Sequence, residues 1–88
     1  MAKIDYEKLA AEIIGKVGGT ENIHTVSHSA TRLRFVLKDR SLANEKELRQ
    51  LQGVLGSVYG SGQFQVILGE NLFPVYDAIL KNYNLDEG

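Results

Sequence analysis

Near the start of the chain, apolar residues recur every three or four positions. The residues in this pattern are Tyr6, Leu9, Ala10, Ile13, Ile14 and Val17. Asp5 is of a type that caps helix N-termini, and Gly18-Gly19 breaks the pattern. The spacing therefore predicts an amphipathic helix that begins after Asp5 and ends before Gly18.

Alternation of apolar and polar residues predicts strands further along the chain. A short strand of mixed polarity is expected over residues 22–27, and the clearest alternation runs over residues 32–38. Two further strands, residues 54–59 and 63–68, are separated by Gly60-Ser61-Gly62. Glycines in such a short connection are typical of a tight hairpin turn, so these two strands are expected to pair.

Two more helices are predicted from their ends and their apolar residues. Asn44 followed by Glu47 matches a capping box, in which each side chain accepts from the other residue's backbone N–H, and Gly53 ends that short helix. The last helix tolerates Pro74 in its first turn, because first-turn N–H groups have no helical partner. Its apolar stripe consists of Leu72, Val75, Tyr76, Ile79 and Tyr83.

The predicted order of elements is α-β-β-α-β-β-α, which indicates an α+β domain. Strands with one apolar and one polar face are typical of a sheet that is covered on one side. We expect a four-stranded, mostly antiparallel sheet with three helices packed on one face. A chain of 88 residues suffices for one core. Residues 1–83 are therefore expected to form a single domain, and residues 84–88 a tail or the start of a linker.

Composition narrows the classes of function and location. A net charge of −1 and a pI near 6.1 give the whole chain no basic field for nucleic acid or an acidic membrane. The chain has no cysteine, which excludes disulfides and thiolate metal sites and favours a reducing, cytosolic setting. No apolar run approaches the roughly 20 residues of a membrane span, and a signal-peptide layout is absent. We expect a soluble domain, which could be part of a larger membrane protein.

Metal and cofactor chemistry is not expected. His24 and His28 would stand roughly 13 Å apart on a strand, which is too far for one metal ion. The glycines around Ser61 lack the Lys-Ser/Thr pair that completes a P-loop.

The stretch from His28 to Phe35 carries the candidate chemistry. If a strand begins near Ala30, its apolar residues face the core, while Arg32 and Arg34 stand together on the solvent face. These arginines follow a turn of small polar residues with free backbone N–H groups, which predicts an anion-binding site. Arginines on the wet face of a strand more often serve solubility alone, and without the flanking residues that interpretation is favoured.

The run from Val26 to Phe35 resembles the active-site signature of the enzyme IIB domain of sugar phosphotransferase systems, in the glucose, sucrose and β-glucoside group. Gly53-Val54-Leu55-Gly56 and the run from Gly62 to Gly69 resemble the family's other two recurrent blocks, in the same order. Three ordered blocks are more specific than any one of them. The resemblance covers nearly the whole chain, from Gly18 to the last helix.

This resemblance implies a sugar phosphotransferase domain that relays a phosphoryl group. In the family, a histidine-phosphorylated IIA domain phosphorylates a cysteine of IIB on sulfur, and the group then passes to sugar held by the membrane IIC domain. The implied partners are IIA and IIC, without nucleic acid and without insertion of this domain into the membrane. The implied location is the cytoplasmic face of the cell membrane.

Ser29 occupies the family's cysteine position, which is the main departure from the signature. Nearby cations and hydrogen-bond donors can lower the pKa of a thiol from its ordinary value of ~8.5, so that the thiol ionises to thiolate. A serine hydroxyl instead needs a strong neighbouring base. This form is therefore expected to fold and dock as a IIB domain, to bind an oxyanion weakly, and to be incompetent in transfer. Either the native residue is cysteine and was changed to serine, or the chain is a natural variant.

The other candidate site residues are assigned either from the family resemblance or from the strand pattern. The resemblance assigns Arg32 and Arg34 to phosphate stabilisation and the onward step to sugar, and Arg supplies planar bidentate donors for phosphate. Backbone N–H groups at Ala30 and Thr31 are expected to bind phosphate. His28, Gln63 and Gln65 are expected at the periphery of the site. The two glutamines are equally explained as surface residues, and a surface or edge position is the favoured interpretation for His28.

A non-catalytic module that binds anions or nucleic acid is the alternative function. Sheets that bind RNA expose aromatic side chains for base stacking, whereas Phe35 and Phe64 are predicted on the apolar faces. Tyr59, near the predicted hairpin turn, is the one remaining candidate for base stacking. If the chain is a phosphotransferase domain, His28 and the Gly62–Val66 block favour the β-glucoside, sucrose and trehalose branch of the family. Sugar specificity itself belongs to the IIC domain.

Overall fold

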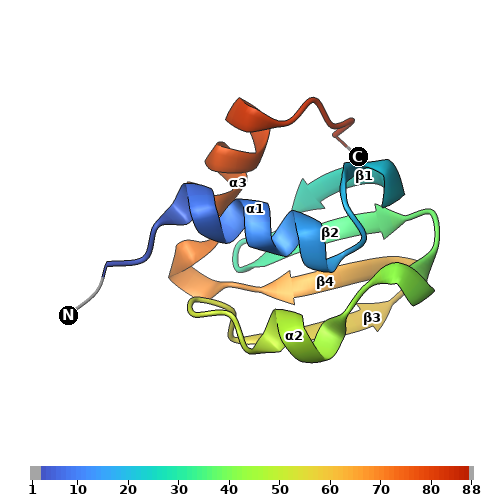
Figure 1. The fold of residues 1–88 in the computed structure, drawn as a ribbon, viewed down its shortest axis with the longest axis horizontal. Helices are drawn as coiled ribbons and strands as arrows, with labels where there is room; N and C mark the ends of the chain where they lie inside the picture. Colours follow the sequence, from blue (N-terminus) through green and yellow to red (C-terminus); the bar gives the residue numbers. More distant parts are fainter. Residues whose placement is uncertain (1–2, 88) are drawn as a thin grey trace.

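The computed structural model describes residues 3–87, so Met1, Ala2 and Gly88 lie outside the described residues. The chain folds into two layers, with helices packed on a sheet (Figure 1). The elements in chain order are α1 (Tyr6–Lys16), η1 (Thr20–Asn22), β1 (Ile23–His28), β2 (Arg32–Leu37), η2 (Arg40–Leu42), α2 (Glu45–Arg49), β3 (Gly56–Gly60), β4 (Gln63–Ile67), η3 (Gly69–Asn71) and α3 (Leu72–Asn82), where η marks a 3₁₀ turn.

The four strands form one sheet in the order β1-β2-β4-β3. Each neighbouring pair is antiparallel, with β2 bonded to β1 on one side and to β4 on the other. The predicted fold class and the α-β-β-α-β-β-α order are confirmed. Because β2 lies between β1 and β4, its residues stand in the middle of the sheet.

A single apolar core lies between the sheet and the helices. The central strands contribute Leu33, Phe35, Phe64 and Val66, all almost fully buried. The helices contribute Leu9, Ala10, Ile13, Ile14, Leu48, Leu72, Val75, Tyr76, Ala78 and Ile79. Since side chains alternate along a strand, Arg32, Arg34 and Gln65 lie on the opposite face of the sheet. Within residues 3–87, no helix has the length and apolar character that crossing a membrane requires.

The predicted N-caps of α1 and α2 are present, but the capping box of α2 is only half formed. Asp5 accepts a hydrogen bond from the Lys8 N–H at 3.1 Å, and Asn44 accepts one from the Glu47 N–H at 3.1 Å. The Asn44 N–H donates instead to the Lys16 carbonyl at 2.6 Å. Glu47 pairs with the Lys16 ammonium at 2.7 Å, so its side chain is drawn to the end of α1.

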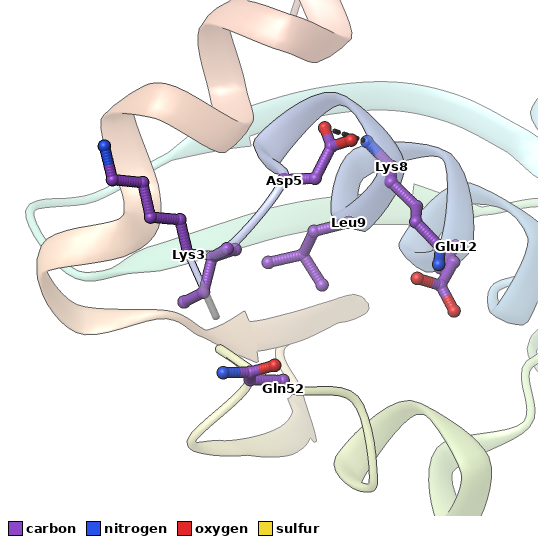
Figure 2. A pocket seen from close by; sticks show the side chains of 7 residues that line it. Lys3, Asp5, Lys8, Leu9, Glu12 and Gln52 are labelled. Atoms are coloured by element: carbon purple, nitrogen blue, oxygen red, sulfur yellow. Dashed lines mark hydrogen bonds between the residues drawn. The ribbon is translucent and has the colours of Figure 1, made fainter. Parts of the chain in front are cut away.

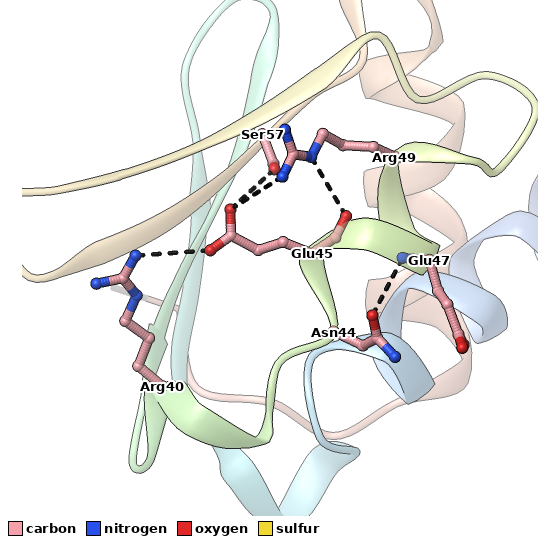
Figure 3. A network of polar contacts seen from close by, with 6 residues as sticks. All are labelled: Arg40, Asn44, Glu45, Glu47, Arg49 and Ser57. Carbon is pink, nitrogen blue, oxygen red and sulfur yellow. Dashed lines mark hydrogen bonds and ion pairs between the residues drawn. The ribbon is translucent and has the colours of Figure 1, made fainter.

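The short helix α2 is attached to the sheet by a polar network centred on Glu45. Figure 3 shows the Glu45 carboxylate between Arg40 and Arg49, with N–O distances of 3.5 and 3.9 Å. Ser57 of β3 donates its hydroxyl to the same carboxylate at 3.4 Å. Arg40 also lies over the ring of Tyr59, with 3.9 Å between guanidinium carbon and ring centroid. These contacts compensate for the few apolar residues of a five-residue helix.

A two-residue turn joins β3 and β4. Ser61 and Gly62 have φ values of 54° and 74°, and Gly60 pairs with Gln63. Positive φ at both central residues is typical of the tight turns that match the twist of a hairpin. The hairpin prediction is confirmed, although β3 begins at Gly56 rather than at Val54, whose side chain is buried in the core.

The segment after α3 lies alongside β1 (Figure 1). The Val26 N–H donates to the Asp86 carbonyl at 2.8 Å, and Val26 and Glu87 form a parallel bridge. Tyr76 of α3 donates its hydroxyl to the Glu87 carboxylate at 3.1 Å. Residues 84–87 are therefore in contact with the domain, and their expected role as a tail or linker stays a prediction.

Candidate functional site

The connection between β1 and β2 carries Ser29, Ala30 and Thr31. The Ser29 N–H donates to the Arg32 carbonyl at 2.9 Å, which closes a tight turn. Among the hydrogen bonds of residues 3–87, none is donated by the N–H of Ala30 or Thr31. Ser29 is half-buried, whereas Ala30 and Thr31 are exposed. Two free backbone donors thus lie directly after the hydroxyl, as an anion site requires.

The chain after β4 holds this turn in place. The N–H groups of Leu68 and Gly69 both donate to the Thr31 carbonyl, at 2.9 and 3.0 Å. Gly69 adopts φ +58°, and a Cβ there would lie 3.0 Å from Cδ1 of Leu55. Glycine at position 69 therefore lets the chain after β4 pass close to Leu55 while its N–H bonds the Thr31 carbonyl. The sequence analysis missed these two donors, since backbone bonds between distant segments leave no pattern in the residue types.

Arg32 and Arg34 stand on one face of β2, as predicted. In the sheet register, Arg32 pairs with Ile67 of β4, and Arg34 pairs with Ser27 of β1 and Gln65 of β4. Arg32 donates from Nη1 to the Gln65 side-chain oxygen at 3.2 Å. The Nε atom of Arg34 is buried and has no hydrogen-bond partner among the described residues. The two side chains are half-buried, which weakens the purely solubilising interpretation.

The structure separates the two glutamines that were expected at the periphery. Gln65 contacts Arg32 and lies in the cross-strand row of Arg34. Gln63 pairs with Gly60 beside the hairpin turn, two residues further from the loop. Strand geometry places Gln63 roughly 7 Å beyond Gln65. Gln65 is thus the glutamine that belongs to the arginine cluster.

His28 packs against α3 rather than on the Ser29 hydroxyl. Its ring lies 4.4 Å from the ring of Tyr76 and 5.5 Å from that of Phe73, between centroids and edge to face. Its Nδ1 is 2.9 Å from the Ser29 carbonyl and donates to it in the tautomer protonated at Nδ1. Among the described residues, no hydrogen bond joins the imidazole to the Ser29 hydroxyl, so in this geometry His28 is not placed to take the hydroxyl proton.

Tyr76, the aromatic partner of His28, has a perturbed ionisation. Burial raises the pKa of the Tyr76 phenol, and the hydrogen bond to the Glu87 carboxylate raises this pKa further. Both effects favour the neutral hydroxyl, because ionisation would place a second negative charge beside Glu87. Tyr76 consequently remains a hydrogen-bond donor at physiological pH.

Two hollows of the molecule lie away from this turn. One is shown in Figure 2, where Lys3, Asp5, Lys8, Leu9, Glu12 and Gln52 surround it at the start of α1. Another lies between the N-terminal segment and α3 and includes Pro74 and Lys81. Within residues 3–87, no group of three or more acidic or histidine side chains is arranged to hold a metal ion. The site is thus a surface turn with cationic and N–H donors, which suits a bound oxyanion.

The aromatic residues named for the alternative function do not form a stacking surface. Phe35 and Phe64 are buried in the core, with 0% and 1% exposure. Tyr59 is 38% exposed, but the Arg40 guanidinium covers its ring. A role in stacking nucleic acid bases is therefore not favoured.

Comparison with known proteins relates this chain to components of phosphotransferase systems. The family described as phosphotransferase system, EIIB, matches residues 11–44. The β-glucoside-specific EIIBCA component of the phosphotransferase system (PTS) from Bacillus subtilis is 44% identical over 84 residues, which are 96% of this chain and 14% of that protein. The sucrose-specific EIIBC component of the same organism is 40% identical over 94% of this chain and 18% of its own length.

A solved structure is also similar to this chain over most of that structure's length. It is the crystal structure of one domain of the PTS system, IIabc component, from Clostridium difficile. The match has a TM-score of 0.88 and 38% identity, and it covers 94% of this chain and 86% of that one. By contrast, this chain spans less than a fifth of the two Bacillus subtilis relatives.

Proposed function

This chain belongs to the EIIB family of the phosphotransferase system, whose members are phosphotransferase components of sugar transport, and we propose that it is a phosphoryl-relay domain. In this proposal, residue 29 accepts a phosphoryl group from a IIA domain and passes it to a sugar held by a membrane IIC domain. The domain works at the cytoplasmic face of the membrane. Component names such as EIIBCA and EIIBC among the relatives support IIA and IIC as partners.

The observation that carries this proposal is the placement of Ser29 beside unused donors. The Ala30 and Thr31 N–H groups follow it, and Arg32 and Arg34 stand on the next strand with the Arg34 Nε unpartnered among the described residues. A phosphoryl group in transfer carries negative charge on its equatorial oxygens, and such donors stabilise that charge. The site offers electrostatic stabilisation and positioning, which is most of what phosphoryl transfer needs.

The chemistry at residue 29 requires two displacements. In the first, the P–N bond of a phosphohistidine breaks as a bond forms from phosphorus to the residue 29 side chain. In the second, that bond breaks as a sugar hydroxyl attacks phosphorus and releases its proton to a base or solvent. A cysteine thiolate suits both steps, because it is a good nucleophile and a good leaving group.

Ser29 suits neither displacement. Among the described residues, its hydroxyl has no hydrogen bond to a base, and the His28 imidazole contacts the Ser29 carbonyl instead. Even a phosphorylated serine would be an ordinary phosphate ester and would resist transfer to another hydroxyl. The proposal is therefore that this Ser29 form folds and docks as an EIIB domain but does not relay phosphate.

The test is to compare the chain with its Ser29→Cys variant. Each is mixed with a histidine-phosphorylated IIA domain of the β-glucoside or sucrose type, and the intact masses are measured. We expect a single added phosphoryl group on Ser29→Cys, localised to residue 29, and none on the Ser29 chain. Ser29→Ala serves as the matched control for phosphorylation elsewhere. Absence of an adduct on folded Ser29→Cys would refute the relay function.

A further inference from the structure

The turn that carries Ser29 takes its position from the residues after β4. The two bonds from the Leu68 and Gly69 N–H groups to the Thr31 carbonyl connect it to the start of η3. Two other bonds of the turn are local: the Ser29 N–H donates to the Arg32 carbonyl, and His28 Nδ1 lies 2.9 Å from the Ser29 carbonyl. A displacement of η3 would therefore reach the turn directly through Thr31.

Asn71, the last residue of η3, joins that segment to the helical layer. Its Oδ1 accepts a hydrogen bond from the Tyr6 hydroxyl at 3.0 Å, and its Nδ2 donates to the Gly53 carbonyl at 3.4 Å. Its backbone N–H donates to the Leu68 carbonyl at 3.1 Å. One amide group thus connects the start of α1, the chain after α2 and the segment that holds Thr31.

The packing around Gly53 keeps this connection close. Gly53 has φ +101°, and a Cβ there would lie 2.9 Å from Cδ2 of Leu9 and 3.6 Å from Nδ2 of Asn71. Both Tyr6 and Asn71 are half-buried, so their hydrogen bond is partly shielded from water. Glycine at position 53 thus lets the chain after α2 approach Leu9 and the Asn71 amide closely.

We infer that Asn71 is a positioning residue for the phosphoryl-accepting turn, an assignment that rests on the proposed function. The side-chain amide fixes η3, and η3 places the Leu68 and Gly69 N–H groups on the Thr31 carbonyl. With that carbonyl fixed, the Ala30 and Thr31 N–H groups keep one orientation relative to residue 29. Misplacement of reacting groups by ~1 Å can cost on the order of 10²-fold in rate.

The experiment uses Ser29→Cys as the parent and adds Asn71→Ala or Tyr6→Phe. Tyr6→Phe removes only the hydroxyl, so it keeps the test meaningful if Asn71→Ala unfolds. Asn22→Ala is the matched control, because the Asn22 amide makes three bonds to Val17 and Asp39, at the far end of β1 from the turn. Three quantities are measured: the rate of phosphoryl acceptance from IIA per folded molecule, amide hydrogen exchange by NMR, and amide chemical shifts by NMR.

We expect Asn71→Ala to slow acceptance by about 10-fold or more, and Tyr6→Phe to slow it less. Exchange at Leu68 and Gly69 should become faster, and the Ala30 and Thr31 amide shifts should move. Asn22→Ala should lower stability while its rate per folded molecule stays that of the parent.

Two results would overturn the assignment while leaving the relay function intact. One is an Asn71→Ala rate equal to that of Asn22→Ala. The other is a slowed rate with unchanged amides at Leu68, Gly69, Ala30 and Thr31. A parent Ser29→Cys that accepts no phosphate would instead overturn the relay function, and the positioning role would fall with it.

Discussion

The Arg34 guanidinium contributes a buried, unpartnered donor to the site: its Nε has no hydrogen-bond partner among residues 3–87. A buried donor in that state costs roughly 1–3 kcal/mol, and folded proteins retain few of them. Arg32 differs, because its Nη1 already donates to Gln65. An oxyanion would remove this cost only by accepting from Nε itself, and the side chain must move for that because Nε is shielded from solvent. Arg32 would have to share or exchange its bond with Gln65.

The first residue-scale prediction concerns lysine replacements of these arginines. In the Ser29→Cys form, Arg32→Lys and Arg34→Lys keep the positive charge but lose the planar, bidentate donors. We expect delivery of phosphate to sugar to fall by on the order of 10²-fold, with a smaller effect on acceptance from IIA. The two steps are measured separately, as loading of residue 29 and as sugar phosphate formed with a IIC domain present.

Arg49→Lys on α2 is the control for these replacements, because Arg49 is exposed and lies in the Glu45 network. It should leave both steps unchanged. Equal losses in acceptance and delivery would contradict the assignment and would mean that Arg32 and Arg34 maintain the turn as a whole.

At this scale, the sequence predicted the placement of residues that follows from strand alternation. Arg32 and Arg34 share a face because they are two apart in a strand, and this needs no knowledge of the fold. Gln65 could not be distinguished from Gln63 until the register of β4 against β2 was known. Asn71 gave no signal, since its partner Tyr6 is 65 positions away and polar side chains near helix starts are common.

The connection after α2 depends on glycine at one position. Gly53 combines φ +101° with a Cβ position 2.9 Å from a Leu9 methyl carbon. We expect Gly53→Ala to lower the free energy of unfolding by about 1–3 kcal/mol, because alanine is strained at this φ. The measurement is urea denaturation.

Gly15 provides the opposite case within α1. A Cβ at Gly15 would meet no atom within 4 Å. Gly15→Ala should raise the free energy of unfolding by about 0.5 kcal/mol, because alanine favours the helix and restricts the unfolded chain. The strain argument would be wrong if the two substitutions had the same sign.

Among the elements, local patterns predicted the types and order, while contacts between elements modified the details. The capping box at Asn44 lost one bond because the end of α1 competes for both partners, through the Lys16 carbonyl and ammonium. In β1, the register shifts between Ile23 and Thr25, so Ile23 and Val26 are both buried although they are three apart. Such an irregularity depends on the pairing strand and is not visible in the residues of β1 alone.

At the scale of the whole molecule, Tyr76 couples the C-terminal segment to the helices. Its pKa is raised by burial and by Glu87, so the folded state favours the protonated phenol. The resulting stability is present below pH 10.0, the ordinary value for tyrosine. It is lost as the pH rises through the higher folded pKa, since the unfolded state then binds fewer protons.

We therefore expect Tyr76 to titrate above pH 10.0 and Glu87→Gln to lower its pKa toward that value. Burial should keep the pKa somewhat raised in Glu87→Gln. The measurement is tyrosinate absorbance against pH, with Tyr76→Phe identifying the contribution of this residue. An unchanged titration in Glu87→Gln would show that the hydrogen bond at 3.1 Å does not persist in solution.

The contact between the C-terminal segment and β1 also bears on self-association. β1 is an edge strand, and an open edge offers a row of N–H and C=O groups on which another chain can add as a further strand. Asp86 and Glu87 occupy that row at Val26, in the middle of β1. A second chain therefore cannot extend the ladder along the whole edge while the segment is in place. The segment that carries Glu87, the hydrogen-bond partner of Tyr76, thus covers the middle of the β1 edge.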